Sequence, residues 1–302
     1  MFIADNWKDY EVLYAGSEEK YERWGDVLLR RPDPQAIWPV IKDGQEATWD
    51  DLDKPHAIYN RSSTGGGSWG RYKPMPATWT IGYNSIGKEL KFIIEPTAFK
   101  HTGLFPEQAA NWDFCGNLIE KARAEGRNEI NVLNLFAYTG GATIAAAAHG
   151  ATEVVHVDSS KGMIMRAKEN AQKSGLGDSY IRYIAEDCKK FVEREIRRGR
   201  KYDGIIMDPP KYGRGPTGEL WQIEKDLHDF VKRVALLLSD DPLFFVISSY
   251  ATELGCQAVG NVLEVVVKSK FGGQVEAQEL GLPIKNMGID LPCGQTARWS
   301  KS

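Results

Sequence analysis

The sequence has few cysteines, and they are not arranged to cross-link a small fold or to hold a metal. The 302 residues include four cysteines, at positions 115, 188, 256 and 293, and no two of them form a C-x-x-C pair. This scatter argues against a disulfide framework and against a cysteine-rich zinc site. It favours a reducing compartment, so we expect a cytoplasmic protein without a metal centre.

Long apolar runs and a large net charge are also missing. Leu243–Ile247 is among the longest apolar runs, far short of the roughly 20 residues of a membrane-spanning helix. Asp5 and Asp9 stand where a secretory signal would need its apolar stretch. The formal net charge of −3 gives no overall basic field that would attract nucleic acid, which leaves only a local patch for such binding.

Two regions of the chain differ in composition. Six of the nine tryptophans precede residue 80, among recurrent prolines and short runs of β-type residues. These runs predict strands at Asp26–Leu29, Ala36–Ile41 and Ala77–Tyr83, and the glycine-rich residues 62–68 predict a flexible loop. We therefore expect residues 1–98 to form a small β-rich domain that contributes to substrate recognition.

Residues 99–302 alternate between helical and strand patterns. The predicted strands are Asn131–Phe136, Glu153–Val157, Tyr180–Ala185, Asp203–Met207, Leu243–Ser248, Val275–Leu280 and Thr296–Trp299. Such strand–helix alternation implies a mostly parallel sheet with helices on both faces. The expected fold class is therefore α/β, with the smaller β-rich domain preceding it.

Four consecutive predicted strands end in residues that are suited to ligand binding. In an open α/β sheet, ligands bind beyond the C-terminal ends of the strands. Gly140 and Gly141 permit a sharp turn and a close approach of a ligand to the backbone. Asp158 can accept hydrogen bonds from both hydroxyls of a ribose, and Asp187 can accept one from an adenine amino group. The two prolines after Asp208 fix the direction of that carboxylate.

Each of these features also has a purely structural interpretation. Glycines after a strand often form only a turn, and acids at this place often cap a helix. The turn after the first predicted strand lacks the G-x-G-x-x-G fingerprint, which disfavours a dinucleotide, and the sequence has no P-loop motif. An adenosine ligand without a phosphate fits the four strand ends better, and S-adenosylmethionine (SAM) is such a ligand.

Several motifs together resemble those of the class I SAM-dependent methyltransferases. The matching positions are 101–108 (HTGLFPEQ), 134–141 (NLFAYTGG), Asp158, Asp187 and 208–211 (DPPK). More narrowly, the chain resembles a bacterial group related to the large-subunit ribosomal RNA cytosine-C5 methyltransferases, although the PUA domain of that family is not recognisable. The resemblance implies a seven-stranded, mostly parallel Rossmann-like methyltransferase sheet.

The resemblance also implies which residues bind the cofactor. Asp158 would hold the ribose of SAM and Asp187 its adenine, while the turn at residues 105–108 would close over the methionine end. The full implied set is Phe105, Pro106, Gln108, Asn134, Phe136, Ala137, Tyr138, Thr139, Gly140, Gly141, Asp158, Ser159, Asp187, Cys188 and Asp208.

The chain departs from the cytosine-C5 enzymes at the nucleophile. Methylation at C5 needs a cysteine thiolate that adds to the base, and the family places this cysteine after the fifth strand, where Ser248 and Ser249 stand here. We therefore expect direct transfer to a nitrogen or an oxygen. The expected catalytic residues are Asp208, Pro209, Lys211 and Tyr212. His101 as a general base and Cys293 as a relocated thiol remain alternatives.

Three functions remain open from the sequence. The first is a SAM-dependent methyltransferase that acts on RNA, most simply on a ribosomal RNA base. The second keeps the cofactor and takes a small molecule or a protein side chain as acceptor, and the third is a SAM-binding factor without catalysis. An RNA-binding surface is expected at Trp69, Arg71, Tyr72 and Lys73, where cations adjoin stacking rings. The charged residues 189–201 alternate in sign, which is typical of a solvated helix face.

Overall fold

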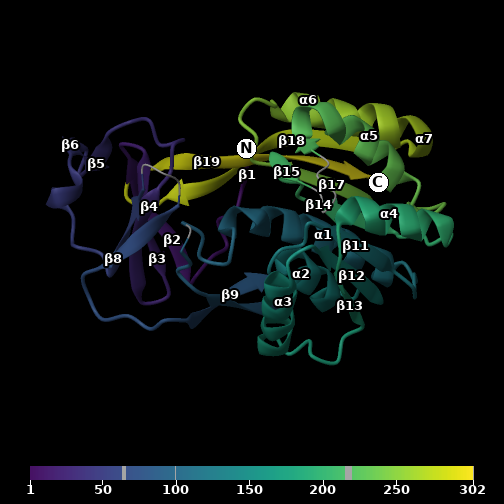
Figure 1. Ribbon diagram of the computed structural model, residues 1–302, viewed down its shortest axis with the longest axis horizontal. Helices are drawn as coiled ribbons and strands as arrows, with labels where there is room; N and C mark the ends of the chain where they lie inside the picture. Colours follow the sequence, from purple (N-terminus) through teal and green to yellow (C-terminus); the bar gives the residue numbers. More distant parts are fainter. Residues whose placement is uncertain (63–65, 99, 215–219, 302) are drawn as a thin grey trace.

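The computed structural model describes residues 1–62, 66–98, 100–214 and 220–301, so residues 63–65 of the expected flexible loop lie outside the described residues. A long mixed sheet runs through the molecule (Figure 1). Seven of its strands form the half of the molecule that is expected to be catalytic, named the catalytic half. Their spatial order is β13 (Ile181–Ala185), β12 (Glu153–Asp158), β11 (Asn131–Leu135), β14 (Gly204–Met207), β17 (Phe244–Ser249), β19 (Ile289–Ser300) and β18 (Gln274–Ile284).

The pairing within these seven strands confirms the expected α/β fold. The first five strands in that order pair in parallel, and β19 runs antiparallel to both β17 and β18. Because the strand order reverses on either side of β11, the carboxyl ends of β11 and β14 border a crevice where a ligand can bind.

Helices cover both faces of this part of the sheet. One layer consists of α1 (Ala109–Ala124), α2 (Gly141–Ala148) and α3 (Lys161–Lys173). The other consists of α4 (Cys188–Arg197), α5 (Ile223–Ala235) and α6 (Cys256–Leu263), after which a π-helical turn (Glu264–Lys268) leads into α7 (Ser269–Phe271). Apolar residues of alternate parity along β11, such as Leu133 and Val132, enter two different cores, one under each helix layer.

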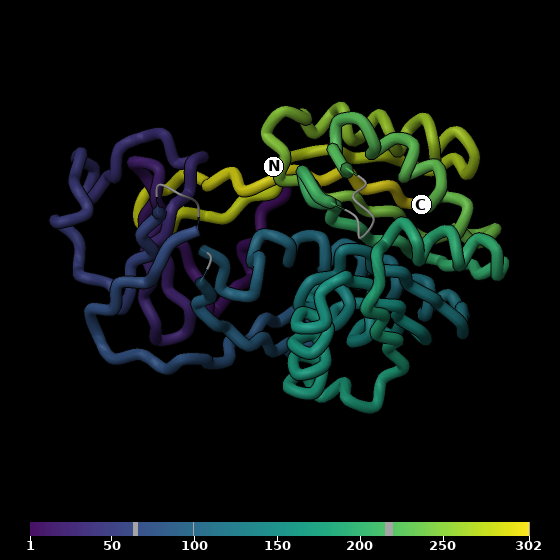
Figure 2. Tube along the Cα trace, in the orientation of Figure 1, coloured from purple at the N-terminus to yellow at the C-terminus, as the bar shows by residue number. Residues whose placement is uncertain are grey.

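The N-terminal strands continue the same sheet. They are β2 (Tyr10–Gly16), β3 (Glu19–Trp24), β4 (Val27–Pro32), β7 (Ala57–Arg61) and β8 (Gly67–Arg71), with β1 (Phe2–Ile3) beside β18. The connection is made by β18, where Ile284 pairs with Val12 of β2. Figure 2 shows the long β18–β19 hairpin, in yellow, reaching from the catalytic half to the N-terminal strands.

Three small two-stranded sheets complete the fold of the described residues. The hairpin of β9 (Trp79–Ser85) and β10 (Lys88–Ile94) packs against α1, α2 and α3. The other pairs are β5 (Val40–Lys42) with β6 (Gln45–Ala47), which precede a 3-10 turn at Trp49–Asp51, and β15 (Tyr212–Arg214) with β16 (Leu220–Gln222).

The expected strand at Ala36–Ile41 is wrong for most of its length. Only Val40 and Ile41 lie in a strand, whereas the carbonyls of Ala36 and Trp38 accept hydrogen bonds from the β2–β3 turn at Glu18 and Ser17. Pro34 precedes this stretch and Pro39 lies within it, and proline cannot donate to a strand ladder. The segment therefore folds as turns that close over β2 and β3.

Candidate functional site

The turn after β11 has an unusual backbone that lets it wrap closely. Phe136, Tyr138 and Gly140 have φ angles of 56°, 49° and 87°, in the left-handed region, which costs energy for the two non-glycine residues. The buried Cys188 Sγ accepts a hydrogen bond from the Phe136 N–H at 3.3 Å and so supports the turn from below. A Cβ on Gly141 would lie 2.5 Å from the Trp112 ring, so only glycine fits there.

Two carboxylates stand at the ends of the next two strands, as the sequence predicts. Asp158 Oδ2 accepts from the Tyr138 N–H at 2.9 Å, and its Oδ1 accepts from the Ser160 N–H at 2.8 Å. Asp187 caps α4 by accepting from the Lys190 N–H at 3.0 Å. Each carboxylate keeps lone pairs for hydroxyl or amino groups, and Asp158 is only partly buried. Ser159 lies beside it and is exposed.

These features fit an adenosyl ligand. The turn at 136–141 lines a cavity together with Phe105 and Asp208, and the acceptor set of Asp158 and Asp187 matches a ribose and an amino group. Asn134 Nδ2 donates to Thr143 Oγ1 at 2.9 Å, and both residues are buried beneath the turn. This hydrogen bond therefore holds the end of β11 against α2 beneath the turn.

A small cavity of about 60 Å³ lies beside this turn, and it adjoins a larger one. The small cavity is lined by Phe105, Gln108, Asn134, Phe136, Ala137, Tyr138, Thr139, Gly141 and Asp208, among others. The second cavity, of about 600 Å³, shares Leu104, Phe105 and Asp208 with the first. It is also lined by Pro106, Pro209 and Lys211, so most predicted cofactor and catalytic residues line one of the two adjoining cavities, whereas Asp158 and Asp187 line neither.

Asp208 is an acid of this site whose pKa is strongly shifted. Burial raises the pKa of Asp208 to about 7, and the nearby charge of Glu107 adds to the effect. Burial also raises the pKa of Glu107, which accepts a hydrogen bond from Tyr250 Oη at 2.9 Å. Gln108 Nε2 in turn donates to Tyr250 Oη at 2.9 Å. Two acids thus share the floor of the larger cavity, and at neutral pH one of them readily holds a proton.

The residues Glu107 and Tyr250 are functional candidates that were not among the predicted site residues. Glu107 lies in the 3-10 turn Pro106–Gln108, within a motif that the sequence analysis quotes, and Tyr250 follows β17 directly. The sequence alone does not show that these positions, more than 140 residues apart, form a hydrogen bond.

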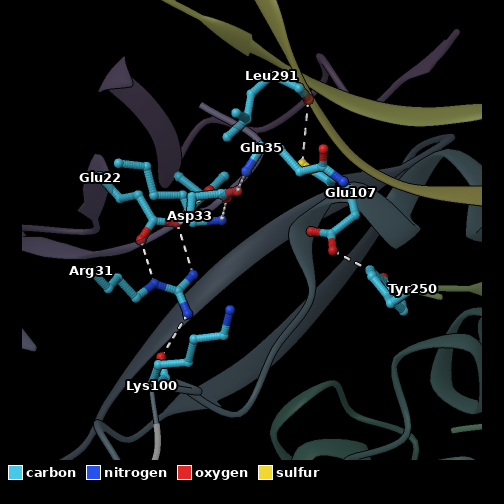
Figure 3. A network of polar contacts seen from close by, with 11 residues as sticks. Glu22, Arg31, Asp33, Gln35, Lys100, Glu107, Tyr250 and Leu291 are labelled. Atoms are coloured by element: carbon cyan, nitrogen blue, oxygen red, sulfur yellow. Dashed lines mark hydrogen bonds and ion pairs between the residues drawn. The ribbon is translucent and has the colours of Figure 1, made fainter. Parts of the chain in front are cut away.

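The opposite wall of the larger cavity carries cations from the N-terminal strands. Arg31 pairs with the buried Glu22, with Nε 2.5 Å from Oε2 and Nη2 2.8 Å from Oε1, and its Nη1 donates to the Lys100 carbonyl at 2.9 Å. Lys20 Nζ lies 3.1 Å from Asp33 Oδ2. Figure 3 shows Arg31 and Lys100 on one side of this space and Glu107 with Tyr250 on the other.

The larger cavity is also lined by His101 and Cys293, the alternatives for proton transfer and for nucleophilic attack. Burial lowers the pKa of His101 to about 4, and Arg31, Lys100 and Lys20 contribute, so His101 is a weak base. Cys293 lines the same cavity, but burial holds the pKa of its thiol well above the usual range, and Sγ lies 3.4 Å from the Leu291 carbonyl. A thiol in this state is a poor nucleophile.

The remaining predicted catalytic residues differ in how exposed they are. Pro209 is buried, whereas Lys211 is exposed and pairs with Glu253. Tyr212 is 50% exposed on β15 and lies outside the described lining of both cavities. Ser248 is buried and bonded to Asn111 and Gln108, so its hydroxyl is held by structural partners.

The structure divides the expected RNA-binding surface on the N-terminal strands. Trp69 is partly buried, and its indole N–H donates to the Thr97 carbonyl at 2.7 Å. Arg71, Tyr72 and Lys73 are exposed, and Lys54 Nζ lies 4.2 Å from the centre of the Tyr72 ring. The ring and cations of this surface are thus open to solvent, whereas the tryptophan packs into the fold.

The charged helix α4 behaves as a solvated face, as its alternating signs predict. Arg194 pairs with Glu186 at 2.5 Å and Glu193 pairs with Arg233 at 2.7 Å, while Phe191 and Val192 are buried.

No helix in the described part of the chain is long and apolar enough to cross a membrane.

Comparison with known proteins agrees with this geometry. The sequence profile of the S-adenosylmethionine-dependent methyltransferase family matches residues 58–252. A SAM-dependent methyltransferase structure from Agrobacterium tumefaciens is 34% identical, with a TM-score of 0.88, and the match covers 99% of this chain and 92% of that one. A Streptococcus mutans structure, 17% identical with a TM-score of 0.68, covers 98% of this chain and 76% of its own and shows the same fold.

Curated relatives match over shorter segments. The ribosomal RNA large subunit methyltransferase K/L of Shewanella frigidimarina is 33% identical over 150 residues, which are 49% of this chain and 20% of that protein. The ribosomal RNA large subunit methyltransferase I of Aeromonas hydrophila is 32% identical over 123 residues, 41% of this chain and 29% of that protein. The chain thus spans less than a third of the length of these relatives.

Proposed function

Because the chain belongs to the S-adenosylmethionine-dependent methyltransferase family, we propose that it methylates a base in RNA, with ribosomal RNA as the first substrate to test. The observation that carries the proposal is the cavity of about 600 Å³ beside the expected cofactor site, which is lined both by Asp208 and by the cations Lys20, Arg31 and Lys100. Two curated relatives with ribosomal RNA in their names support the choice of acceptor. With this substrate the protein would work in the cytoplasm.

We assign the cofactor to the turn after β11 and to the two strand-end carboxylates. SAM, when bound, supplies an electrophilic methyl group on its sulfonium sulfur. Asp158 would hold the ribose and Asp187 the adenine, while Cys188 would support the Phe136 backbone from below. The turn Pro106–Gln108, which ends at the start of α1, would close the methionine end.

Asp208 is the residue that we assign to the acceptor. Methyl transfer to a nitrogen or an oxygen releases one proton, and a carboxylate with a pKa of about 7 can accept it near neutral pH. The two prolines that follow fix the direction of the carboxylate. The Pro209 carbonyl would accept a hydrogen bond from a second N–H or O–H group of the substrate. Tyr250, through its hydrogen bond to Glu107, keeps the second acid of the floor in place.

A covalent thiol mechanism receives no support from the cavity. The residue at the expected nucleophile position, Ser248, is buried and hydrogen-bonded, and the Cys293 thiol has a raised pKa. Direct transfer needs only alignment of the acceptor and an outlet for its proton, both of which Asp208 and its surroundings can provide.

The test is transfer of a radiolabelled methyl group from SAM into separated fractions of a strain that lacks the gene. RNA, protein and small molecules are each incubated with the purified chain and counted. The proposal predicts label in RNA, above the level in the other two fractions. Label in protein or in small molecules alone would overturn the choice of acceptor, and no label in any fraction would favour a SAM-binding factor.

A further inference from the structure

One ammonium group in the larger cavity has no carboxylate to pair with among the residues that the structure describes. Lys100 lies between the β9–β10 hairpin and the turn Pro106–Gln108, and its carbonyl accepts from Arg31 Nη1 at 2.9 Å, which anchors its backbone. Its side chain is partly buried and lines the cavity. Among the described residues, no carboxylate oxygen lies within ion-pairing distance of its Nζ, and Figure 3 shows the ammonium without a bond.

The other two cations of this wall are already neutralised. Arg31 is held by both oxygens of Glu22, and Lys20 Nζ lies 3.7 Å from Glu22 and 3.1 Å from Asp33. The two positive charges of Lys20 and Arg31 balance the two negative charges of Glu22 and Asp33. Lys100 therefore gives the wall an excess of one positive charge. A partly buried charge without a partner costs free energy that an incoming anion can recover.

The surroundings of Lys100 make that charge costly in the absence of an anion. Burial lowers the pKa of Lys100, Lys20 adds to this effect, and Arg31 and Arg61 contribute further, against the opposing effect of Asp33. Arg61 is exposed at the end of β7, so positive potential extends from the cavity toward the surface of the N-terminal strands. An anionic chain that enters from this side would meet favourable potential along its path.

The floor of the cavity has the opposite character. Glu107 and Asp208 are acids, so they repel an anionic group and favour one that donates a hydrogen bond. A ligand that suits both walls has an anion at one end and an N–H or O–H edge at the other. A nucleotide has both, and a cavity of about 600 Å³ is within the usual range for a ligand of this size.

We propose that Lys100 binds a phosphate of the acceptor nucleotide and thereby places the edge of its base toward Asp208. This inference rests on the proposed function, because it assumes that the acceptor belongs to a nucleic acid. Lys100 is then a binding residue that selects acceptors carrying a phosphate, and it takes no part in the transfer itself.

The test compares three variants of the full-length protein in methyl transfer to RNA. Lys100→Gln is expected to raise KM for RNA about tenfold or more, the usual weight of a charge-assisted hydrogen bond, with kcat within about twofold and SAM affinity unchanged. Lys100→Arg keeps the charge and is expected to restore most of the affinity. Lys88→Gln removes an exposed lysine of β10 that does not line the cavity, and is the matched control.

Salt dependence provides a second readout that a structural role would not change. Loss of one phosphate contact is expected to reduce the slope of log KM against log salt by about 0.7 for a single-stranded substrate. If Lys100→Gln matches Lys88→Gln in both KM and slope, the proposal is overturned. If Lys100→Arg fails as Lys100→Gln does, while both unfold at the wild-type temperature, a role for the charge is excluded.

Failure of the proposed function can be told apart from failure of this inference. If the wild-type protein methylates no RNA, binding of the four ribonucleoside monophosphates and of their nucleosides is measured by NMR titration. The proposal then predicts that the wild type prefers the monophosphates and that Lys100→Gln loses this preference. Equal binding of monophosphate and nucleoside by the wild type would overturn it.

Discussion

At the residue scale, Asp208 combines a fixed direction with an altered proton affinity. It follows β14, and Pro209 and Pro210 hold the next stretch of chain extended. Its raised pKa has burial as the main cause and Glu107 as the second. A carboxylate exchanges its proton most usefully when its pKa lies near the working pH, so this position is suited to receive the proton that the acceptor loses.

Replacing Asp208 tests that role through rate and pH together. Asp208→Asn is expected to lower kcat by about 10²-fold or more, the low end for a lost acid–base group, with SAM affinity nearly intact. The wild-type rate is expected to rise with pH through about 7, as Asp208 loses its proton, and the variant is expected to lose this rise. Steady-state rates from pH 5.5 to 8.5 measure both, with the exposed Asp240→Asn as control.

A structural role for Asp208 would leave a different signature. Because its folded pKa is raised from 3.8 to about 7, the native state binds the proton more tightly, and stability is lost as pH rises through that window. An Asp208→Asn variant with normal turnover and a flatter dependence of unfolding free energy on pH would show that the carboxyl only affects stability.

Asp158 offers a second test at this scale, through cofactor binding. Asp158→Ala is expected to weaken the binding of SAM by about 1–3 kcal/mol, because it leaves ligand hydroxyls and the Tyr138 N–H without their acceptor. Calorimetric titration with SAM measures the change, and Asp178→Ala, an exposed acid before β13, serves as control. Unchanged affinity in Asp158→Ala would remove this residue from the cofactor site.

At the scale of elements, a network of polar side chains holds the β9–β10 hairpin against α1. Asp113 of α1 accepts from Tyr83 Oη and from Ser85 Oγ, each at 2.6 Å. Ser85 Oγ also lies 2.9 Å from His149 Nε2, and His149 Nδ1 lies 2.8 Å from Glu120 Oε1. A serine, a histidine and a glutamate in line resemble a hydrolase triad, but Ser85 is fully buried, so the cluster holds elements together.

Replacing Asp113, at the centre of this network, is expected to lower the free energy of unfolding. Asp113→Ala leaves two hydroxyls without their acceptor, at about 1–3 kcal/mol for unsatisfied buried groups. Urea denaturation measures the free energy of unfolding, and Glu89→Ala on the same hairpin, whose ion pair with Lys91 is exposed, is expected to change it by less than about 1 kcal/mol. Equal effects of the two substitutions would contradict a stabilising role for the Asp113 network.

The elements of the catalytic half were predictable because their signals are local. β11, β12 and β17 are mainly apolar runs followed by polar or turn residues, and their ends differ from the predicted ranges by no more than one residue. The β9–β10 hairpin was only half predicted, since Lys88–Ile94 carries charge at three of seven positions and its burial depends on packing against α2 and α3.

At the scale of the whole molecule, the cavity is assembled from segments that are remote in sequence. The acidic floor comes from Glu107 and Asp208, and the cationic wall comes from Lys20, Arg31 and Lys100. The sequence predicted Asp208 because a strand end and two prolines mark it locally. It could not predict the wall, because the packing of β3 and β4 against the catalytic half depends on the β18–β19 hairpin. The domain boundary at residue 98 likewise stays a prediction, because the sheet continues across it.

The buried ion cluster of this wall has a testable effect on stability. Burial alone would raise the pKa of Glu22, but Arg31, Lys20 and the Tyr10 hydroxyl lower it from 4.5 to about 2. Its contribution is therefore present above pH 4.5 and lost as pH falls toward 2. Glu22→Gln is expected to lower the unfolding free energy at pH 7 by about 3–5 kcal/mol and to weaken this acid dependence.

Chemical denaturation between pH 2 and 7 measures the effect of Glu22→Gln. The exposed Glu46→Gln is the control and is expected to match the wild type. A Glu22→Gln variant as stable as the wild type at pH 7 would mean that Arg31 finds another partner, and the cationic wall would not depend on this cluster.

The most direct test of the account is nucleoside mass spectrometry after reaction with SAM that carries a deuterated methyl group. RNA from a strain lacking the gene is incubated with the wild type or with Asp208→Asn and then digested to nucleosides. We predict that the wild type places the deuterated methyl on a nitrogen or an oxygen of one ribonucleoside, and that Asp208→Asn reduces this label by about 10²-fold. Label on carbon C5 of cytidine, or an equal yield from Asp208→Asn, would contradict the account.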